Sequence, residues 1–265
     1  TALSGYHLAH LHRQDYRLPR QFVNGRALIV QHRTAWKALA GEGSMSGFDN
    51  HFRSIIDKFG PPSNGPAADT AMLEEYGGRA PEALLAFWAA YGLGFWRDDY
   101  FHLCDPRRYR PVVDAIFQGD PDFRPEEIHV YGMSAFGHLL AWSETRRIAR
   151  VDIISHAVRC PDFFKPKPHI SVVKSLYGAD DEGYDALDRD GQPMFRRAVR
   201  KYGTLSYGQI YAPRLHPALG GDLVLENFRP ASALEALVLS AEAAPFHLKD
   251  TLSRPPRIAR EIGAS

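Results

Sequence analysis

Apolar residues recur every three to four positions in several stretches of the chain. This helical period predicts helices over residues 46–59, 70–76, 81–91, 105–117, 193–202 and 232–241. Pro81 and Pro193 stand at first-turn positions, where a helix tolerates proline. Gly92 and Gly203 follow the last apolar positions of their helices and are typical of helix ends. Proline and glycine therefore mark the bounds of two of the predicted helices.

Shorter stretches between these helices have the composition and bounding turns of strands. Strands are predicted over residues 94–96, 100–103, 127–133, 136–142, 147–154 and 223–225. The first two flank Arg97, Asp98 and Asp99 and predict a hairpin. Helices cluster at one end and strands in the middle of each half, which favours an α+β fold over a doubly wound sheet. We expect two mixed helix/antiparallel-strand domains packed together, preceded by an N-terminal extension.

Changes in composition along the chain predict where its segments begin and end. Residues 1–44 carry six Lys or Arg against Asp15 and Glu42, and they end in a Gly-Glu-Gly-Ser run before Met45. This leader is either a native, partly ordered tail or an extension, fusion or cloning scar. The Lys-Pro-Lys-Pro run at 165–168 indicates a linker or sharp bend. The predicted segments are the basic leader (1–44), a first domain (45–164), a second domain (165–250) and a tail expected to be loose (251–265).

The overall composition is that of a globular protein. Of the 265 residues, 45% are hydrophobic and 24% charged, which is the usual balance for a folded domain. No window approaches 18 consecutive apolar residues, so we expect no membrane span. The first residues lack a charged start followed by an apolar run, so no signal peptide is indicated. Cys104 and Cys160 are too few for a disulfide scaffold and suit a reducing compartment. These features predict a cytoplasmic protein.

The sequence lacks the common motifs of cofactor, metal and nucleophile chemistry. Neither glycine-rich nucleotide motif occurs, and no G-x-S-x-G is present. The acidic stretch at 179–191 departs from the calcium-loop pattern at Ala186 and Arg197. Cys104 is expected to pack rather than react, because its neighbour Asp105 would raise the pKa of the thiol. We therefore predict no cofactor and no metal site, and an enzymatic role has no support from any motif.

Acidic and aromatic residues in one loop favour binding instead. The loop over 179–191 carries six acidic residues against Arg189, with Tyr177 and Tyr184 beside them. Acidic clusters repel nucleic acid and attract basic surfaces, and tyrosines in a charged rim are common binding anchors. Such a loop suits an inhibitor of a DNA-binding toxin, although a loop that only improves solubility would look the same. The candidate partner-binding residues are Tyr177, Asp180, Asp181, Glu182, Tyr184, Asp185, Asp188, Gln209 and Arg214.

Several stretches, taken in order, resemble a known pair of domains. The chain is similar to the GAD-like domain at His51-Phe52, Glu75-Tyr76-Gly77-Gly78, Ala80-Pro81-Glu82-Ala83-Leu84-Leu85, Cys104-Asp105-Pro106 and Ala135-Phe136-Gly137-His138. It resembles the C-terminal domain that commonly follows at Asp190-Gly191, Pro193-Met194-Phe195, Tyr202-Gly203, Ile210-Tyr211 and Ala218-Leu219-Gly220-Gly221. This combination resembles the type VI secretion immunity proteins, including the antidote of a DNase effector.

The resemblance implies a cytoplasmic protein that binds a cognate effector toxin, with a nuclease as the expected partner. It would block the active site or the DNA surface of that toxin, without a cofactor and without contacting nucleic acid or a membrane itself. Gln209 replaces an acidic residue of the family, and Arg214 is a second departure, so a partner other than a standard DNase stays open. Two alternatives remain: a hydrolase or transferase with a site among Asp105, His138 and Glu144, or a ligand-sensing regulatory module.

Overall fold

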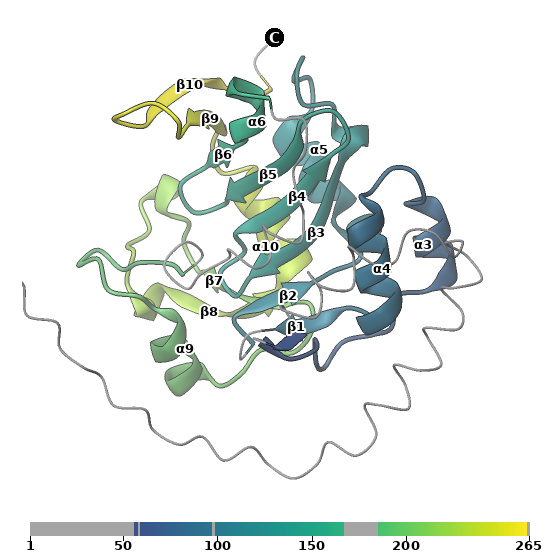
Figure 1. Ribbon diagram of the computed structural model, residues 1–265. Helices are drawn as coiled ribbons and strands as arrows, with labels where there is room; N and C mark the ends of the chain where they lie inside the picture. The colour runs from purple at the N-terminus through teal and green to yellow at the C-terminus, as the bar shows by residue number, and fades with distance from the viewer. Residues whose placement is uncertain (1–55, 58, 97–98, 167–184, 264–265) are drawn as a thin grey trace, which may run out of the picture.

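The fold is α+β, as the sequence predicted, and is built around one large sheet (Figure 1). The computed structural model describes residues 56–57, 59–96, 99–166 and 185–263. The eight strands of the large sheet are β1 (Gly94–Trp96), β2 (Phe101–Leu103), β3 (Ile128–Ser134), β4 (Leu139–Ser143), β5 (Arg147–Asp152), β6 (Ala157–Arg159), β9 (His247–Asp250) and β10 (Arg257–Glu261). A separate two-stranded sheet pairs β7 (Gln209–Pro213) with β8 (Phe228–Ser232).

The large sheet joins strands that lie far apart in the sequence. Its order is β1-β2-β3-β4-β5-β6-β9-β10, so the first six strands follow chain order as a meander. All neighbours are antiparallel except β6 and β9, which pair in parallel through Ala157–His247 and Val158–Leu248. A parallel pair requires a long crossover, and here the crossover contains β7, β8 and the helices of the second half. The domain boundary near residue 165 stays a prediction, but the sheet contains strands from both sides of it.

The helices cover the ends and one face of the sheet. They are α3 (Thr70–Glu75), α4 (Glu82–Tyr91), α5 (Arg110–Phe117), α6 (Pro161–Phe164), α9 (Phe195–Tyr202) and α10 (Ala233–Ala241), with short 3-10 turns at Pro106–Tyr109, Pro125–Glu127, Pro217–Leu219 and Leu225–Asn227. Figure 1 shows α3 and α4 beside the β1–β2 end of the sheet and α9 near β7 and β8. Helices α5 and α10 pack against each other, which links the two halves of the chain.

Three clusters of buried side chains form the core. The first lies among the sheet, α5 and α10 and includes Val112, Val151 and Leu237. The second packs α3 and α4 against β1 and β2 around the fully buried Trp88. The third surrounds Tyr211 and joins β7 and β8 to α9. Aromatic rings carry much of this burial, because each removes a large apolar area from water.

The predicted elements of the first half are confirmed with small shifts. Helix α4 follows Pro81 and ends at Gly92, and the predicted hairpin forms between β1 and β2. Asp69, rather than Thr70, caps α3, because its carboxylate accepts a hydrogen bond from the Met72 N–H at 2.6 Å. The predicted helix over 46–59 lies mostly outside the described residues.

Two predictions for the second half are wrong, and two strands were missed. The strand expected at 223–225 does not form, and β7 and β8 were not predicted as strands. Each contains a proline and few β-branched residues, so neither has the composition that marks a strand in the sequence. Proline is tolerated in them because each strand is paired on one side in its two-stranded sheet. The tail after Lys249 is not loose as predicted, because β9 and β10 pair through residues as far as Glu261. Strand β10 buries little apolar surface and therefore leaves no hydrophobic pattern in the sequence.

Candidate partner-binding surface

Two of the three described acidic residues of the predicted binding loop, Asp185 and Asp188, are turned toward the chain itself, whereas Asp190 is exposed. The carboxylate of Asp185 accepts hydrogen bonds from the N–H groups of Met194 (3.1 Å) and Phe195 (3.0 Å), at the start of α9. Asp188 is buried and accepts from the N–H groups of Asp190 and Gln192. These contacts fold the loop into a cap for α9, because carboxylates satisfy the free N–H groups of a first helical turn.

Asp188 also forms an ion pair with Arg197 of α9. The hydrogen bond from Arg197 is the main cause that lowers the pKa of Asp188, so the carboxylate stays ionised. Asp188 therefore shapes the loop, and any contribution to binding is indirect. The other predicted residues of this region, Tyr177, Asp180, Asp181, Glu182 and Tyr184, lie outside the described residues.

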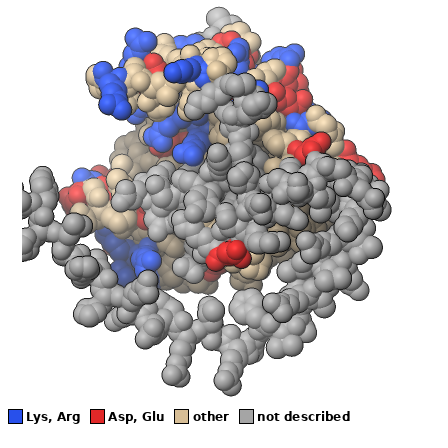
Figure 2. All heavy atoms as spheres, in the orientation of Figure 1, with Lys and Arg blue, Asp and Glu red and all other residues tan. Residues whose placement is uncertain are grey.

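Arginines occupy the exposed side of α9. Arg196 and Arg200 on the helix and Arg189 in the preceding loop are exposed, while Lys201 pairs with Glu226. Figure 2 shows Lys and Arg side chains gathered at the lower left, where Figure 1 places α9. The exposed side of α9 therefore presents positive charge, with the exposed acids Asp190 and Asp222 close by in the adjoining loops. The acidic surface over residues 179–184 stays a prediction, because those residues lie outside the described ranges.

Two exposed leucines stand on the loop that joins β7 to β8. Leu215 is 48% exposed and Leu219 is 59% exposed. The side chain of Asn227 holds this loop in place: its Oδ1 accepts from the Leu215 N–H at 3.1 Å, and its Nδ2 donates to the carbonyls of Leu215 (2.8 Å) and Asp222 (3.0 Å). The leucines are thus displayed by a loop whose backbone is fixed from within.

His216 anchors the same loop to the large sheet. Its Nδ1 accepts from the Ala218 N–H at 3.2 Å, which leaves Nε2 to donate to the Ile153 carbonyl at 3.0 Å. Burial lowers the pKa of His216, so the ring is neutral at pH 7 and can make both bonds. The ring stacks on His156 with 4.6 Å between centroids. The loop is therefore attached to the turn between β5 and β6.

A glycine makes this tight loop possible. A Cβ on Gly221 would lie 1.9 Å from the Leu215 carbonyl oxygen. Any side chain at this position would push residues 215 and 221 apart, so only glycine permits the observed closure.

The remaining predicted residues flank this loop. Arg214 is exposed, and its N–H donates to the Asn227 carbonyl at 2.6 Å. Gln209 lies at the other end of β7, half-buried, with its Oε1 accepting from the Ser206 N–H at 2.9 Å. The Arg189 N–H donates to the Leu223 carbonyl, which places the α9 cap beside the leucine loop. We call residues 187–190 and 214–222 together the loop face; the sequence indicated Asp188 and Arg214 within it but not the leucines.

Comparisons with known proteins agree with the sequence resemblance. Residues 50–155 match the GAD-like domain, and residues 173–242 match the C-terminal domain of the T6SS immunity protein Tdi1. Among solved structures, the crystal structure of Atu4351 from Agrobacterium tumefaciens superposes with a TM-score of 0.78 and 38% sequence identity. The match covers 81% of this chain and 99% of Atu4351. The chain belongs to the Tdi1 family of type VI secretion immunity proteins.

Membership of the Tdi1 family confirms the resemblance seen in the sequence and supports a role in type VI secretion immunity. Among curated proteins, none matches the chain. No helix within the described ranges is long and apolar enough to cross a membrane.

The residues of the enzyme alternative lie in separate polar contacts in this Tdi1-family chain. Asp105 binds Arg107, Glu144 accepts from His129 at 2.7 Å, and His138 Nδ1 lies 3.7 Å from a carboxylate oxygen of Asp152. In the ranges that the structure describes, no group of three or more His, Cys, Asp or Glu is placed to hold a metal. The family suggests a non-enzymatic role, and each of these residues has a structural partner.

An apolar groove of about 680 Å³ lies between α3 and α4. Its lining includes Leu73, Leu85 and Trp88, with Thr70 and Glu74 as polar members. The lining is mostly apolar, and among the described lining residues Glu74 is the one carboxylate.

Proposed function

We propose that this Tdi1-family protein neutralises a cognate type VI effector toxin by docking the loop face over its active site or DNA-binding surface. The expected toxin is a DNase, and the complex forms in the cytoplasm. The fixed, exposed pair Leu215 and Leu219 carries this proposal. Hydrogen bonds fix the backbone of this loop, and the two leucine side chains on it stay exposed to water. Apolar side chains held in this way can serve as contact points for another protein.

The geometry of the loop favours tight binding. Binding must compensate for the entropy lost when flexible loops are ordered. Here the bonds from Asn227 and His216 order the leucine loop before any partner arrives. The leucines would form the water-excluding centre of the contact, and the surrounding charged residues, including Arg189 and Arg214, would form its polar rim.

The charge of the chain fits a nuclease target. A DNase needs a basic surface for the phosphates of its substrate. The whole chain has a net charge of +1, and residues 1–44 contribute +4. The remaining residues therefore have a net charge of −3. In this proposal Asp180, Asp181 and Glu182 supply acidic contacts, with Tyr177 and Tyr184 as anchors beside them. Asp185 and Asp188 support that loop from inside.

Aspartate substitutions at the two leucines test the proposal. We expect Leu215→Asp or Leu219→Asp each to weaken binding of the cognate effector by about 30-fold or more, the usual effect at an anchor residue. Leu239→Asp is the matched control, because Leu239 is 68% exposed on α10 and lies outside the loop face. Co-expression with the effector reports growth rescue, and titration calorimetry on the purified pair reports affinity.

Two results would contradict the proposal. One is full rescue and unchanged affinity in the doubly substituted protein. The other is turnover of a substrate by the purified chain, with loss of that turnover on replacement of His138 or Glu144, which would favour the enzyme alternative.

A further inference from the structure

Strand β10 is exposed on both of its faces. Arg257, Ile258 and Ala259 are all exposed, and Ile258 reaches 64%. Figure 1 shows the hairpin of β9 and β10 projecting from the end of the large sheet. Because β10 is the last strand in the sheet order, it pairs with β9 and, among the described residues, with no strand on its other side. The other edge presents N–H and C=O groups that can pair with another strand.

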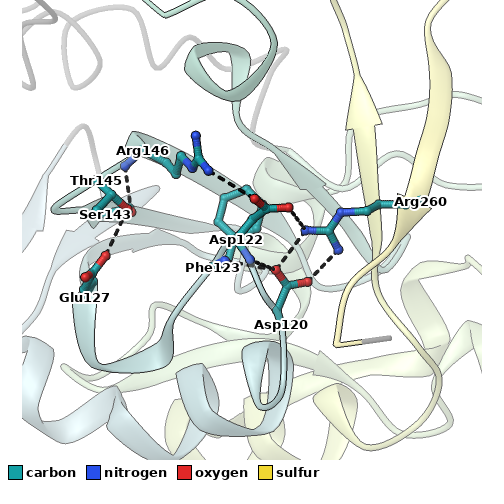
Figure 3. Close-up of polar contacts among 8 residues, drawn as sticks. All are labelled: Asp120, Asp122, Phe123, Glu127, Ser143, Thr145, Arg146 and Arg260. Atoms are coloured by element: carbon teal, nitrogen blue, oxygen red, sulfur yellow. Dashed lines mark hydrogen bonds and ion pairs between the residues drawn. The ribbon is translucent and has the colours of Figure 1, made fainter. Parts of the chain in front are cut away.

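An ion-pair cluster holds the base of this hairpin firmly (Figure 3). Arg260 on β10 donates to both carboxylate oxygens of Asp120, at 2.6 and 2.8 Å, and to Asp122 at 3.0 Å. The Gly263 N–H donates to Asp120 at 2.9 Å, and Arg146 holds Asp122 from the other side at 3.1 Å. Strand β10 itself buries little apolar surface, so this cluster, together with the buried Ile262 directly after the strand, holds β10 in place.

The turn of the hairpin is fixed as well. The carboxylate of Asp250 accepts from the N–H groups of Leu252 (2.9 Å) and Ser253 (3.2 Å). The Ser253 hydroxyl donates to the Asp250 carbonyl at 3.1 Å and lies 3.1 Å from the Pro255 carbonyl. Leu252 is left exposed at the tip. The hairpin is therefore held by polar contacts from base to tip, although β10 itself buries little apolar surface.

The charge of the hairpin selects the kind of strand that can join it. Residues 249–261 carry four Lys or Arg against Asp250 and Glu261. Arg260 is paired with Asp120 and Asp122, so the rest of the hairpin is positive by one charge. A register shift between Ile258 and Arg260 adds a bulge to the strand. Like charges and bulges at an open edge suppress pairing with an identical edge. An acidic strand would instead gain from Arg254 and Arg257.

The hairpin lies on the same side of the molecule as the leucine loop. His216 of that loop stacks on His156, and the His156 carbonyl accepts from the His247 N–H at the start of β9. In Figure 1 the yellow hairpin and the pale green loops of the second half lie along one side of the sheet. One large partner can therefore contact both surfaces.

We propose that β10 adds an extended, acidic segment of the effector to the sheet as a ninth strand. This inference rests on the proposed function and deepens it by naming a second contact and its chemistry. Main-chain hydrogen bonds would supply the pairing, as in other cases of strand addition. Ile258 and Leu252 would contact apolar side chains of the segment, and Arg254 and Arg257 would pair with its carboxylates.

Hydrogen exchange and affinity together test strand addition. The probe is the purified, catalytically inactivated toxin domain of the type VI effector that the chain neutralises on co-expression. On its addition we expect amide exchange in residues 257–261 to slow at least tenfold. Ile258→Asp and Arg254→Glu should each weaken binding by about tenfold. Leu239→Asp and Lys165→Glu are the matched controls, because both replace exposed residues outside the hairpin and should bind like the wild type.

The outcomes separate this inference from the proposed function. If the effector binds but β10 exchanges as fast as before and both hairpin variants bind normally, strand addition is refuted and the immunity role stands. If the wild type does not bind the effector, both proposals fail. Protection of β10 that rises with the concentration of the chain alone would assign the edge to a second copy and would also overturn the inference.

Discussion

Replacement of Arg260 by alanine measures how strongly the projecting hairpin is held. Breaking one member of a buried ion pair costs about 3–5 kcal/mol. Asp120 has no exposed side-chain surface, but Arg260 is 28% exposed. Asp120 also keeps backbone N–H donors from Asp122, Phe123 and Gly263. We therefore expect Arg260→Ala to lower the free energy of unfolding by about 2–3 kcal/mol at pH 7. This is less than for a fully buried pair, because Arg260 is partly exposed and Asp120 keeps its backbone donors.

The same contact predicts a dependence on pH. Burial alone would raise the pKa of Asp120, but the hydrogen bonds from Arg260 and the backbone outweigh it and lower the pKa to about 2. Because the pKa is depressed in the folded state, this stabilisation is complete above the unfolded-state pKa of about 4. It is lost as the pH falls through about 2. The lowered pKa of Asp120 corresponds to about 2 kcal/mol of folding stability at pH 7, and about half of this stability is lost by pH 3.

Urea unfolding followed by tryptophan fluorescence at pH 7 and pH 3 provides the assay. The difference between wild type and Arg260→Ala should be smaller at pH 3 than at pH 7. Arg257→Ala is the control on the same strand, because Arg257 is mostly exposed and contacts Asp250 at 3.5 Å, and it should change stability by about 0.5 kcal/mol at most. An Arg260→Ala protein as stable as the wild type at pH 7 would refute the reasoning, as would a difference that is independent of pH.

Two further predictions concern the leucine loop and the thiols. Gly221→Ala should lower stability by about 1–3 kcal/mol and weaken effector binding, because its Cβ would meet a carbonyl oxygen at 1.9 Å. Gly220→Ala should cost only about 1 kcal/mol, because its positive φ is strained but nothing lies within 4 Å of its Cβ; equal effects in thermal unfolding would contradict the steric account. Cys104 and Cys160 should not react with a thiol reagent at pH 8 in the folded protein. Both are buried, and burial raises the pKa of Cys104 and brings that of Cys160 to about 11. Rapid labelling of either thiol without denaturant would show that the fold opens locally.

Much of the first half could be read from the sequence, because its signals are local. The apolar period, with Pro81 before it and Gly92 after it, was sufficient to bound α4. The turn residues between β1 and β2 were sufficient to predict their hairpin. Order and spacing of short motifs also indicated the family, which the comparisons confirm. Each of these signals lies within a few helical turns of chain, where backbone preference and burial agree.

The direction of polar side chains could not be read in this way. Asp185 and Asp188 looked like surface acids, yet they bind the start of α9, because free helical N–H groups and Arg197 lie within reach only after folding. The exposure of Leu215 and Leu219 was equally hidden, since a leucine between turn residues usually packs inward.

The sequence by itself determined the short helices and the first hairpin, since periodicity and turn chemistry act between near neighbours. The family was indicated separately, by the resemblance of motifs in both halves of the chain. Only the tertiary structure decided the parallel pairing of β6 with β9, and the attachment of β10 through Arg260 and Asp120, which are 140 positions apart. Strand pairing and buried charge compensation depend on which distant segments meet. A period in the sequence shows that a face will be buried, but not which surface will cover it.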